Sequence, residues 1–127
     1  MLKSLIAATA LALPLAAMAQ PTAPLAVRTQ AEIDHLFTYI AQSGCKFNRN
    51  GSWHNMDEAR DHVATKYDWL RGRGMIDSAE TFIDRAASRS SFSGSDYLVQ
   101  CPGATAVPSG NWLKAELQRF RGQSRKE

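Results

Sequence analysis

Three side chains that can carry charge or transfer protons recur at a spacing of four residues: Glu58, His62 and Lys66. In an α-helix this spacing places side chains on one face, so the sequence predicts a polar ridge along a helix. As a solvated face, the ridge would stabilise the helix by a few tenths of a kcal/mol per pair. As a pocket wall, His62 and Lys66 would bind an anionic group.

A second set of polar groups lies in the Ser- and Gly-rich segment 88–95, which predicts a loop. Its simplest role is structural, with hydroxyls bonded to the local backbone. Alternatively, hydroxyl and backbone N–H groups would contact an anion or a peptide at the candidate positions Ser90, Ser91, Ser93 and Gly94. A catalytic alternative makes Ser91 or Ser93 a nucleophile with His62 as base, but neither a GxSxG nor an SxxK motif surrounds these serines.

A cation on a turn precedes the ridge. Asn50-Gly51 predicts a two-residue hairpin, because both residues tolerate positive φ, and Arg49 and Asn50 are candidate contacts at its tip. We expect Arg49 chiefly to form a structural ion pair with Glu80 or Asp84. If the site were catalytic, Lys66 or Arg49 would stabilise the negative charge that develops in the reaction.

His54, Glu58 and His62 are candidate ligands of a metal ion. His54 precedes the predicted helix, so the three side chains need not converge. The sequence contains no HExxH motif, and its cysteines are better explained as a pair. We therefore predict no metal site and no cofactor.

Residues 1–19 have the pattern of a cleavable signal peptide: a positive start, an apolar run over 5–18, and small residues at Ala17 and Ala19. A membrane anchor is the alternative, but the run is shorter than the about 20 residues of a spanning helix, and a proline interrupts it. We expect cleavage before Gln20 and a periplasmic or secreted protein without a transmembrane segment.

The chain has 2 cysteines, Cys45 and Cys101. In an exported protein a lone pair most simply forms a disulfide, and closing a loop of this length would stabilise the fold by about 4 kcal/mol by the chain-entropy argument. A catalytic thiol would need a neighbouring base and would leave the other cysteine unexplained. We therefore predict a disulfide.

The formal net charge of +3 is small and evenly spread, which argues against nucleic acid as a partner. The basic residues gather only at the C-terminus, where a frayed and solvated end is the simplest interpretation. These residues are Arg119, Arg121, Arg125 and Lys126.

Apolar periodicity predicts helices that would position these groups, over about 30–42, 55–70, 77–87 and 109–121. Asn55 with Glu58, and Asp77 with Glu80, have the spacing of capping boxes. Short strands are predicted beside the Asn-Gly turn and over 97–101. The aromatic residues are expected mainly in the core, although Trp53 could lie on a contact surface. They are Phe47, Trp53, Tyr97 and Trp112.

These elements predict a mainly α fold of the α+β kind, with about four helices and a small antiparallel β element linked by one disulfide. The domain organisation that we expect is a signal peptide over 1–19, a flexible leader over 20–28, one globular domain over 29–122 and a disordered tail over 123–127. A chain of this length supports one modest core.

Several phrases of the sequence together resemble the YfeK-like family of small exported bacterial proteins. The similarity covers most of the expected domain. It implies export and a compact single domain; the family has no assigned activity, so the resemblance transfers no catalytic residue. The matching phrases are Phe47-Asn48-Arg49-Asn50-Gly51, His54, Glu58-Ala59, His62, Lys66, the run from Ile76 to Asp84, Ala87-Ser88, Ser90-Ser91, Ser93-Gly94 and Tyr97-Leu98-Val99.

The hypothesis that these observations favour is a binding or interaction module of the bacterial envelope, such as an inhibitor or immunity-type protein. It would contact another envelope protein or a small anionic ligand. The alternative is a small envelope hydrolase that uses a loop serine with His62, and a third possibility is a structural or chaperone-like protein with an exposed apolar patch. The oligomeric state does not follow from the sequence.

Overall fold

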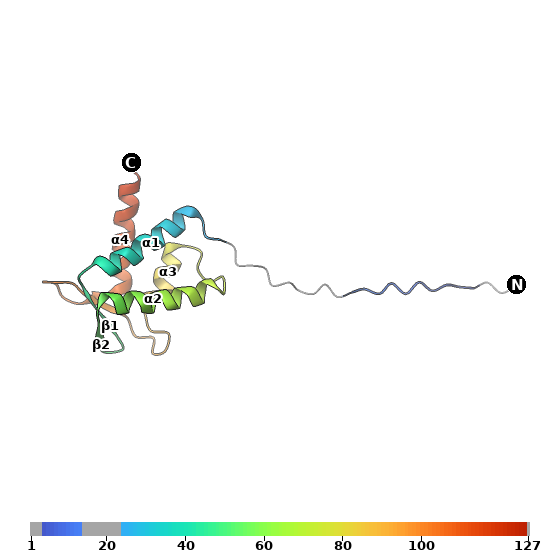
Figure 1. Cartoon of the computed structure of the whole chain (residues 1–127), viewed down its shortest axis with the longest axis horizontal. Helices are drawn as coiled ribbons and strands as arrows, with labels where there is room; N and C mark the ends of the chain where they lie inside the picture. Colours follow the sequence, from blue (N-terminus) through green and yellow to red (C-terminus); the bar gives the residue numbers. More distant parts are fainter. Residues whose placement is uncertain (1–3, 14–23, 127) are drawn as a thin grey trace.

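The computed structural model describes residues 4–13 and 24–126. It combines helices with a small antiparallel sheet, as predicted (Figure 1). In chain order the elements are α1 (Val27–Gln42), β1 (Lys46–Arg49), β2 (Ser52–His54), α2 (Met56–Arg71), α3 (Ala79–Ala86), β3 (Leu98–Gln100), β4 (Val107–Pro108) and α4 (Ser109–Ser124).

The ends of the helices follow local capping, with two differences from expectation. Asn55 caps α2 by accepting a hydrogen bond of 2.9 Å from the backbone N–H of Glu58. For α3 the cap is Ser78, whose hydroxyl accepts from the N–H of Thr81 at 3.0 Å, so the prediction of Asp77 was wrong by one residue. Helices α1 and α4 are each three residues longer than predicted, at their N- and C-terminal ends respectively.

The Asn-Gly turn forms the predicted hairpin between β1 and β2. Asn50 and Gly51 have φ of 52° and 84°, which is the pair of positive values that a type I′ turn requires. The sheet has the order β2-β1-β3-β4, and all its pairs are antiparallel. Strand β4 was not predicted from the sequence, because two residues ending in proline carry no alternation that could indicate a strand.

The predicted disulfide is present. Cys45 lies immediately before β1 and Cys101 immediately after β3, and the two sulfur atoms are bonded. The neighbouring register pairs Lys46 with Gln100 and Asn48 with Leu98. The bridge therefore fastens the two central strands, which are far apart in the chain, side by side.

The core lies between the four helices and one face of the sheet. Its largest fully buried side chains come from α1, α3, β3 and α4: Ile33, Leu36, Ile40, Phe82, Ile83, Val99, Leu113 and Leu117. Phe82 also contacts Phe37 and Tyr67 through edge-on or tilted ring packing. The β1–β2 hairpin and the loop between α3 and β3 project to the same side of α2 (Figure 1).

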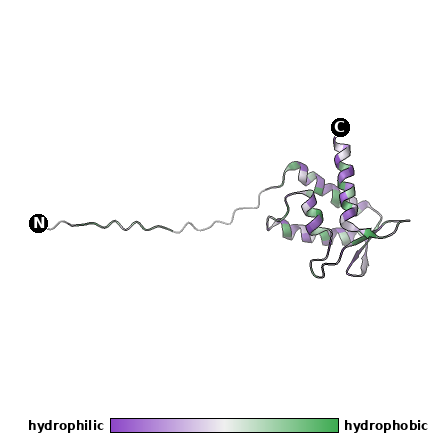
Figure 2. Cartoon of the chain, turned by 180° about the vertical axis from the view of Figure 1, so that it is seen from behind, coloured by the Kyte–Doolittle hydropathy of each residue, from purple (hydrophilic) through white to green (hydrophobic). Residues whose placement is uncertain are grey.

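Two members of the basic C-terminal cluster, Arg119 and Arg121, form ion pairs on α4 and are not part of a frayed end. Arg121 donates to both carboxylate oxygens of Glu32, at 2.6 and 3.1 Å, and also binds Glu80. Glu116 accepts two bonds from Arg119, at 2.5 and 2.6 Å. Because Glu32 is only 5% exposed, Arg121 is the main partner of a buried charge, whose other cationic neighbour is the exposed Arg28 at 3.9 Å. Both arginines lie on α4, whose C-terminal part is largely hydrophilic (Figure 2).

At the N-terminal side, residues 4–13 belong to no helix or strand, and Leu5 is 97% exposed. The expected cleavage site at Ala17–Ala19 and the first expected mature residue, Gln20, lie outside the described residues. Within the part of the chain that the structure describes, we find no helix of sufficient length and apolar character to cross a membrane.

The Arg121 contacts give a stability prediction. Arg121→Met keeps a long apolar side chain but leaves the buried Glu32 carboxylate with only the exposed Arg28 at 3.9 Å, so we expect the free energy of unfolding to fall by about 2 to 4 kcal/mol. Urea denaturation monitored by circular dichroism measures this change. Arg85→Met, at the exposed end of α3, is the matched control and should change stability by less than about 0.5 kcal/mol. Equal effects of the two variants would contradict a structural role for Arg121.

Candidate functional site

Three segments meet around a hollow on the surface: the β1–β2 hairpin, α2 and the loop between α3 and β3. We call this hollow the outer basin. It has a volume of about 470 Å³, and it is lined by Arg49, Asn50, Ser52, His54, His62, Lys66, Ser90, Ser91, Phe92 and Tyr97. The structure therefore places the predicted arginine, histidine, lysine and two loop serines in one concavity.

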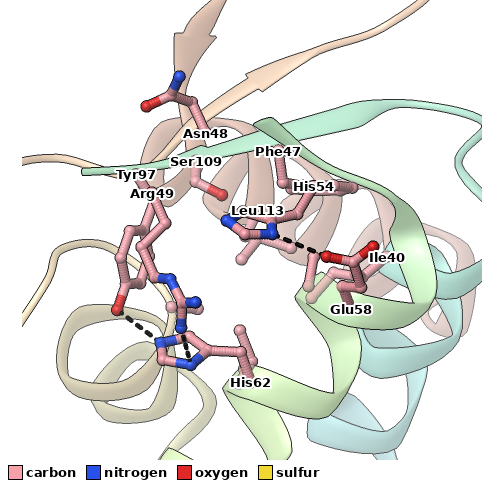
Figure 3. A pocket seen from close by; sticks show the side chains of 13 residues that line it. Ile40, Phe47, Asn48, Arg49, His54, Glu58, His62, Tyr97, Ser109 and Leu113 are labelled. Atoms are coloured by element: carbon pink, nitrogen blue, oxygen red, sulfur yellow. Dashed lines mark hydrogen bonds and ion pairs between the residues drawn. The ribbon is translucent and has the colours of Figure 1, made fainter. Parts of the chain in front are cut away.

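A second, smaller hollow lies deeper, between β1, α2 and α4 (Figure 3). We call it the inner cavity. Its volume is about 130 Å³, and its walls are mainly apolar, with polar groups on two sides. It is lined by Ile40, Phe47, Asn48, Arg49, His54, Glu58, Ala59, His62, Val63, Ala87, Tyr97, Ser109 and Leu113.

The two hollows share four lining residues: Arg49, His54, His62 and Tyr97. A residue that lines both must lie between them, so these side chains form a common wall. Figure 3 shows Arg49 and Tyr97 meeting His62 on one side of the inner cavity, while His54 is paired with Glu58 on the other. The two hollows therefore adjoin at these side chains.

Hydrogen bonding fixes which nitrogen of His62 carries the proton. Its Nδ1 faces a guanidinium nitrogen of Arg49, and a guanidinium can only donate. Nδ1 must therefore accept, which leaves the proton of the neutral ring on Nε2. Nε2 then donates to the hydroxyl oxygen of Tyr97 at 3.1 Å. His62 is held as the neutral Nε2–H tautomer.

Lys66 extends this series of hydrogen bonds by contacting Tyr97. Its Nζ donates to the hydroxyl oxygen of Tyr97 at 3.2 Å and to the carbonyl of Arg89 at 2.7 Å. An ammonium group has three N–H bonds, so one remains for a ligand. Because the oxygen of Tyr97 already accepts from His62 and Lys66, its own O–H is directed toward another acceptor.

The groups that face the outer basin are thus chiefly donors. Arg49 has further N–H groups beyond the one that meets His62, and Lys66 and Tyr97 each have one donor to offer. None of the described residues that line the basin is acidic. The arrangement can bind an anion, and it offers a cation no charged partner.

The serine loop is tied to the hairpin tip by Asn50. Its side-chain N–H donates to the hydroxyl of Ser90 at 3.2 Å, and its oxygen accepts from the hydroxyl of Ser93 at 2.5 Å. Ser90 is 5% exposed, and its oxygen also accepts from the N–H groups of Phe92 and Ser93. The loop hydroxyls therefore chiefly hold the rim of the basin.

Burial and positive charge act on the titratable groups of the wall. Burial is the main cause that lowers the pKa of His62, and the neighbouring charges of Arg49, Lys66 and His54 lower it further. Burial also lowers the pKa of Lys66. It raises the pKa of Tyr97, while the positive charge of Arg49 lowers it. An anion in the basin would offset the cost of holding these positive charges together.

The structure changes several assignments made from the sequence. Arg49 contacts neither Glu80 nor Asp84, which pair with Arg121 and Lys114 instead. The predicted ion pair of Arg49 was therefore wrong, because Arg49 points across the hairpin toward α2.

Among the residues predicted to bind, Ser93 and Gly94 do not line the outer basin, while Ser91 does. Gly94 adopts φ of 74° in the turn of the loop, a conformation that favours glycine. Ser93 contacts the site by donating a hydrogen bond to the side-chain oxygen of Asn50.

Ser52, Phe92 and Tyr97 line the outer basin but were not predicted as site residues. Tyr97 was expected in the core, and it is indeed only 7% exposed, but its hydroxyl reaches the site. The alternation of the strand beside it could have indicated that Tyr97 and Val99 point to one face. Trp53, for which both a core and a surface position were considered, lies at the surface and is 45% exposed.

The catalytic arrangement considered from the sequence is not formed. Both ring nitrogens of His62 have partners, Arg49 and Tyr97, and neither partner is a serine of the loop. His54 and Glu58 pair with each other, and across the described residues no cluster of three or more His, Cys, Asp or Glu side chains could hold a metal.

The fold and the site define a small, mainly α domain with a disulfide-linked sheet and a basic surface basin. The chain belongs to the family of unknown function designated DUF5329, whose profile matches residues 27–121. It is 40% identical over 98 residues to a Salmonella typhimurium (strain LT2) protein named "Uncharacterized protein YfeK", and the match covers 76% of this chain and 77% of that protein. No solved structure matches significantly. The resemblance to the YfeK-like family is thereby confirmed.

The environment of His62 gives a prediction for its titration. An unperturbed histidine has a pKa of about 6.5, and we expect His62 to titrate below this value. Arg49→Gln should raise the pKa of His62, because it removes a positive charge next to Nδ1. Nuclear magnetic resonance of the imidazole C–H groups measures both values, and His62→Gln identifies the signal.

The lowered pKa of His62 also predicts how the stability of the fold changes with pH. Between the lower pKa of the folded chain and the ordinary pKa of the unfolded chain, unfolding takes up a proton at His62, so its contribution to stability decreases as the pH falls through this range. A pKa of His62 at or above the ordinary value would contradict the described environment.

Proposed function

We propose that this protein is a binding module of the bacterial envelope that holds an anionic group in the outer basin. The observation that carries the proposal is the convergence of donors from three separate segments. Arg49 comes from the hairpin, Lys66 from α2, and Tyr97 from the end of the serine loop. Donors fixed by a folded scaffold bind an anion with less loss of conformational freedom than mobile surface side chains.

The chemistry of these groups supports an anion with several oxygen atoms. A guanidinium presents parallel N–H groups that match a carboxylate or phosphate. Charge-assisted hydrogen bonds of this kind are stronger than neutral ones. Since His62 is neutral and hydrogen-bonded on both sides, its role in this proposal is to position Arg49 and Tyr97.

Binding is favoured over hydrolysis by the same geometry. A serine nucleophile needs its base within hydrogen-bond reach, whereas His62 is engaged by Arg49 and Tyr97. The neutral histidine has its Nδ1 lone pair directed at a guanidinium, where it cannot accept a proton from serine. The proposal therefore assigns no catalytic step to the basin.

An inhibitor or immunity-type protein is one form that such a module would take, with the bound anion being a carboxylate of a partner enzyme. Two exposed aromatic side chains support a protein contact at the rim. Phe92 lines the basin and is 97% exposed, and Trp53 lies on the adjacent hairpin and is 45% exposed. Aromatic residues of this kind often contribute strongly to protein interfaces.

Anion binding can be tested with sulfate, whose charge is constant near neutral pH. We expect sulfate to bind to the oxidised protein at constant ionic strength, and Lys66→Met to weaken binding about tenfold, the equivalent of one charge-assisted hydrogen bond. Chemical-shift titration measures the dissociation constants. Lys46→Met, which removes an exposed lysine of β1 outside both hollows, should leave binding unchanged. Absence of sulfate binding, or equal loss in the two variants, would refute the proposal.

We also propose that residues 1–19 direct export to the periplasm and are removed there. The apolar run and the small residues before Gln20 support this, as does the disulfide, which persists in oxidising compartments. Intact-mass analysis of protein from the native host should give a chain that begins at Gln20 and lacks two thiol hydrogens. A chain that retains the leader and has two free thiols would overturn this assignment.

A further inference from the structure

The inner cavity gives the site an apolar compartment directly behind the donors. Phe47 from β1, Val63 from α2 and Leu113 from α4 supply apolar walls. Each of these three side chains is largely buried in the folded chain. Apolar groups that enter such a compartment gain the free energy of leaving water, which the outer basin alone, with its polar rim, cannot provide.

The volume of this compartment limits what can enter. An apolar cavity of about 150 Å³ in another protein accommodates benzene, and the inner cavity here measures about 130 Å³. One small ring or a short branched alkyl group fits this space. A long acyl chain or a fused ring system would have to displace core side chains.

The charged groups that line the cavity indicate the charge of the ligand that we expect. The acidic group of the lining is Glu58, which is paired with His54 at 2.8 Å and has 58% of its side chain exposed. It thus lies at the surface edge and is partly neutralised. On the opposite side the shared wall carries Arg49, with Lys66 just beyond it in the basin.

We propose that the ligand is a small amphipathic acid, whose single ring or short branched alkyl group occupies the inner cavity while its carboxylate or phosphate binds Arg49 and Lys66. This inference rests on the proposed function and adds the class of ligand to it. The wall shared by the two hollows supplies the geometry, because the donors stand at the mouth of the apolar compartment. An acid group attached close to the ring is therefore directed toward Arg49, which lines both hollows, and Lys66, which lines the basin.

Phenylacetate is a suitable probe, with acetate, benzyl alcohol and benzylamine as comparisons. We expect phenylacetate to bind at least tenfold more tightly than acetate, because it buries a ring. Benzyl alcohol, which lacks the charge, should also bind at least tenfold more weakly, and benzylamine should not bind measurably. Titrations by nuclear magnetic resonance or calorimetry, at fixed ionic strength, give these ratios.

A cavity-filling variant separates the two compartments. Ala59 lies on α2 and lines the inner cavity without lining the outer basin. In Ala59→Leu we expect phenylacetate to lose its tenfold advantage over acetate. Ala64→Leu makes the same change on another face of α2, outside both hollows, and should retain the advantage. Thermal denaturation of both variants confirms that the fold is intact.

The outcomes distinguish this inference from the proposed function. If sulfate binds but phenylacetate binds no better than acetate, the ligand class is wrong and the anion site stands. If phenylacetate keeps its advantage in Ala59→Leu, the ring does not occupy the inner cavity and the inference is also refuted. If neither sulfate nor phenylacetate binds, the proposed function itself fails.

The same chemistry occurs at the C-terminus of a polypeptide that ends in an apolar residue. An acetylated tripeptide ending in phenylalanine presents the ring and the carboxylate together, and it provides the comparison. Tighter binding of the tripeptide than of phenylacetate would assign the source to a chain terminus. Tighter binding of phenylacetate would assign it to a free acid.

Discussion

The antiparallel pairing of β1 with β3 is the constraint on which the site depends. Asn48 lies opposite Leu98 in this pair, so the next residue on one strand, Arg49, comes close to the residue that precedes the other, Tyr97. The two strands are separated by two helices in the chain, and a short pair of strands has little stability of its own. The Cys45–Cys101 bond at the far end fixes the pair and limits any slip of register, which would move every side chain to the opposite face.

The neutral state of His62 is the second feature on which the site depends. A charged His62 could not accept a hydrogen bond from Arg49, so deprotonation of Nδ1 is what allows a histidine and an arginine to lie in contact. Burial and the nearby lysine both disfavour the charged ring. The wall therefore concentrates cationic donors around a ring that adds none of its own charge. In this way the protein holds two basic side chains, Arg49 and Lys66, close together with an uncharged ring between them.

Much of the fold could be predicted because its signals are local. The Asn50-Gly51 turn, the cap at Asn55, the apolar faces of the helices and the cysteine pair each depend on residues close in sequence or on simple counting. Strand β4 could not be found in this way, since its two residues are ordered by pairing with β3. The ends of α1 and α4 were also missed, because the three added residues of each helix are mostly exposed and do not continue the apolar face.

The candidate site was predicted in its composition but not in its connections. The spacing on α2 indicated that His62 and Lys66 share a face, and the structure confirms that they line one hollow. The partner of Arg49 was wrong, because charge patterns in a sequence give signs but not distances. The ion pair of Arg121 with Glu32 joins two ends of the folded chain, and a pattern read along the sequence contains no signal for a contact of this range.

The clamp formed by Asn50 has a consequence for exchange of whatever occupies the basin. Its amide joins the hairpin to the serine loop through two side-chain hydrogen bonds near the surface, whereas the core lies on the other side of α2. Breaking two such bonds requires far less free energy than global unfolding. The rim can therefore open as a local hinge between two turns while the helices, the central strands and their sulfur bridge remain in place.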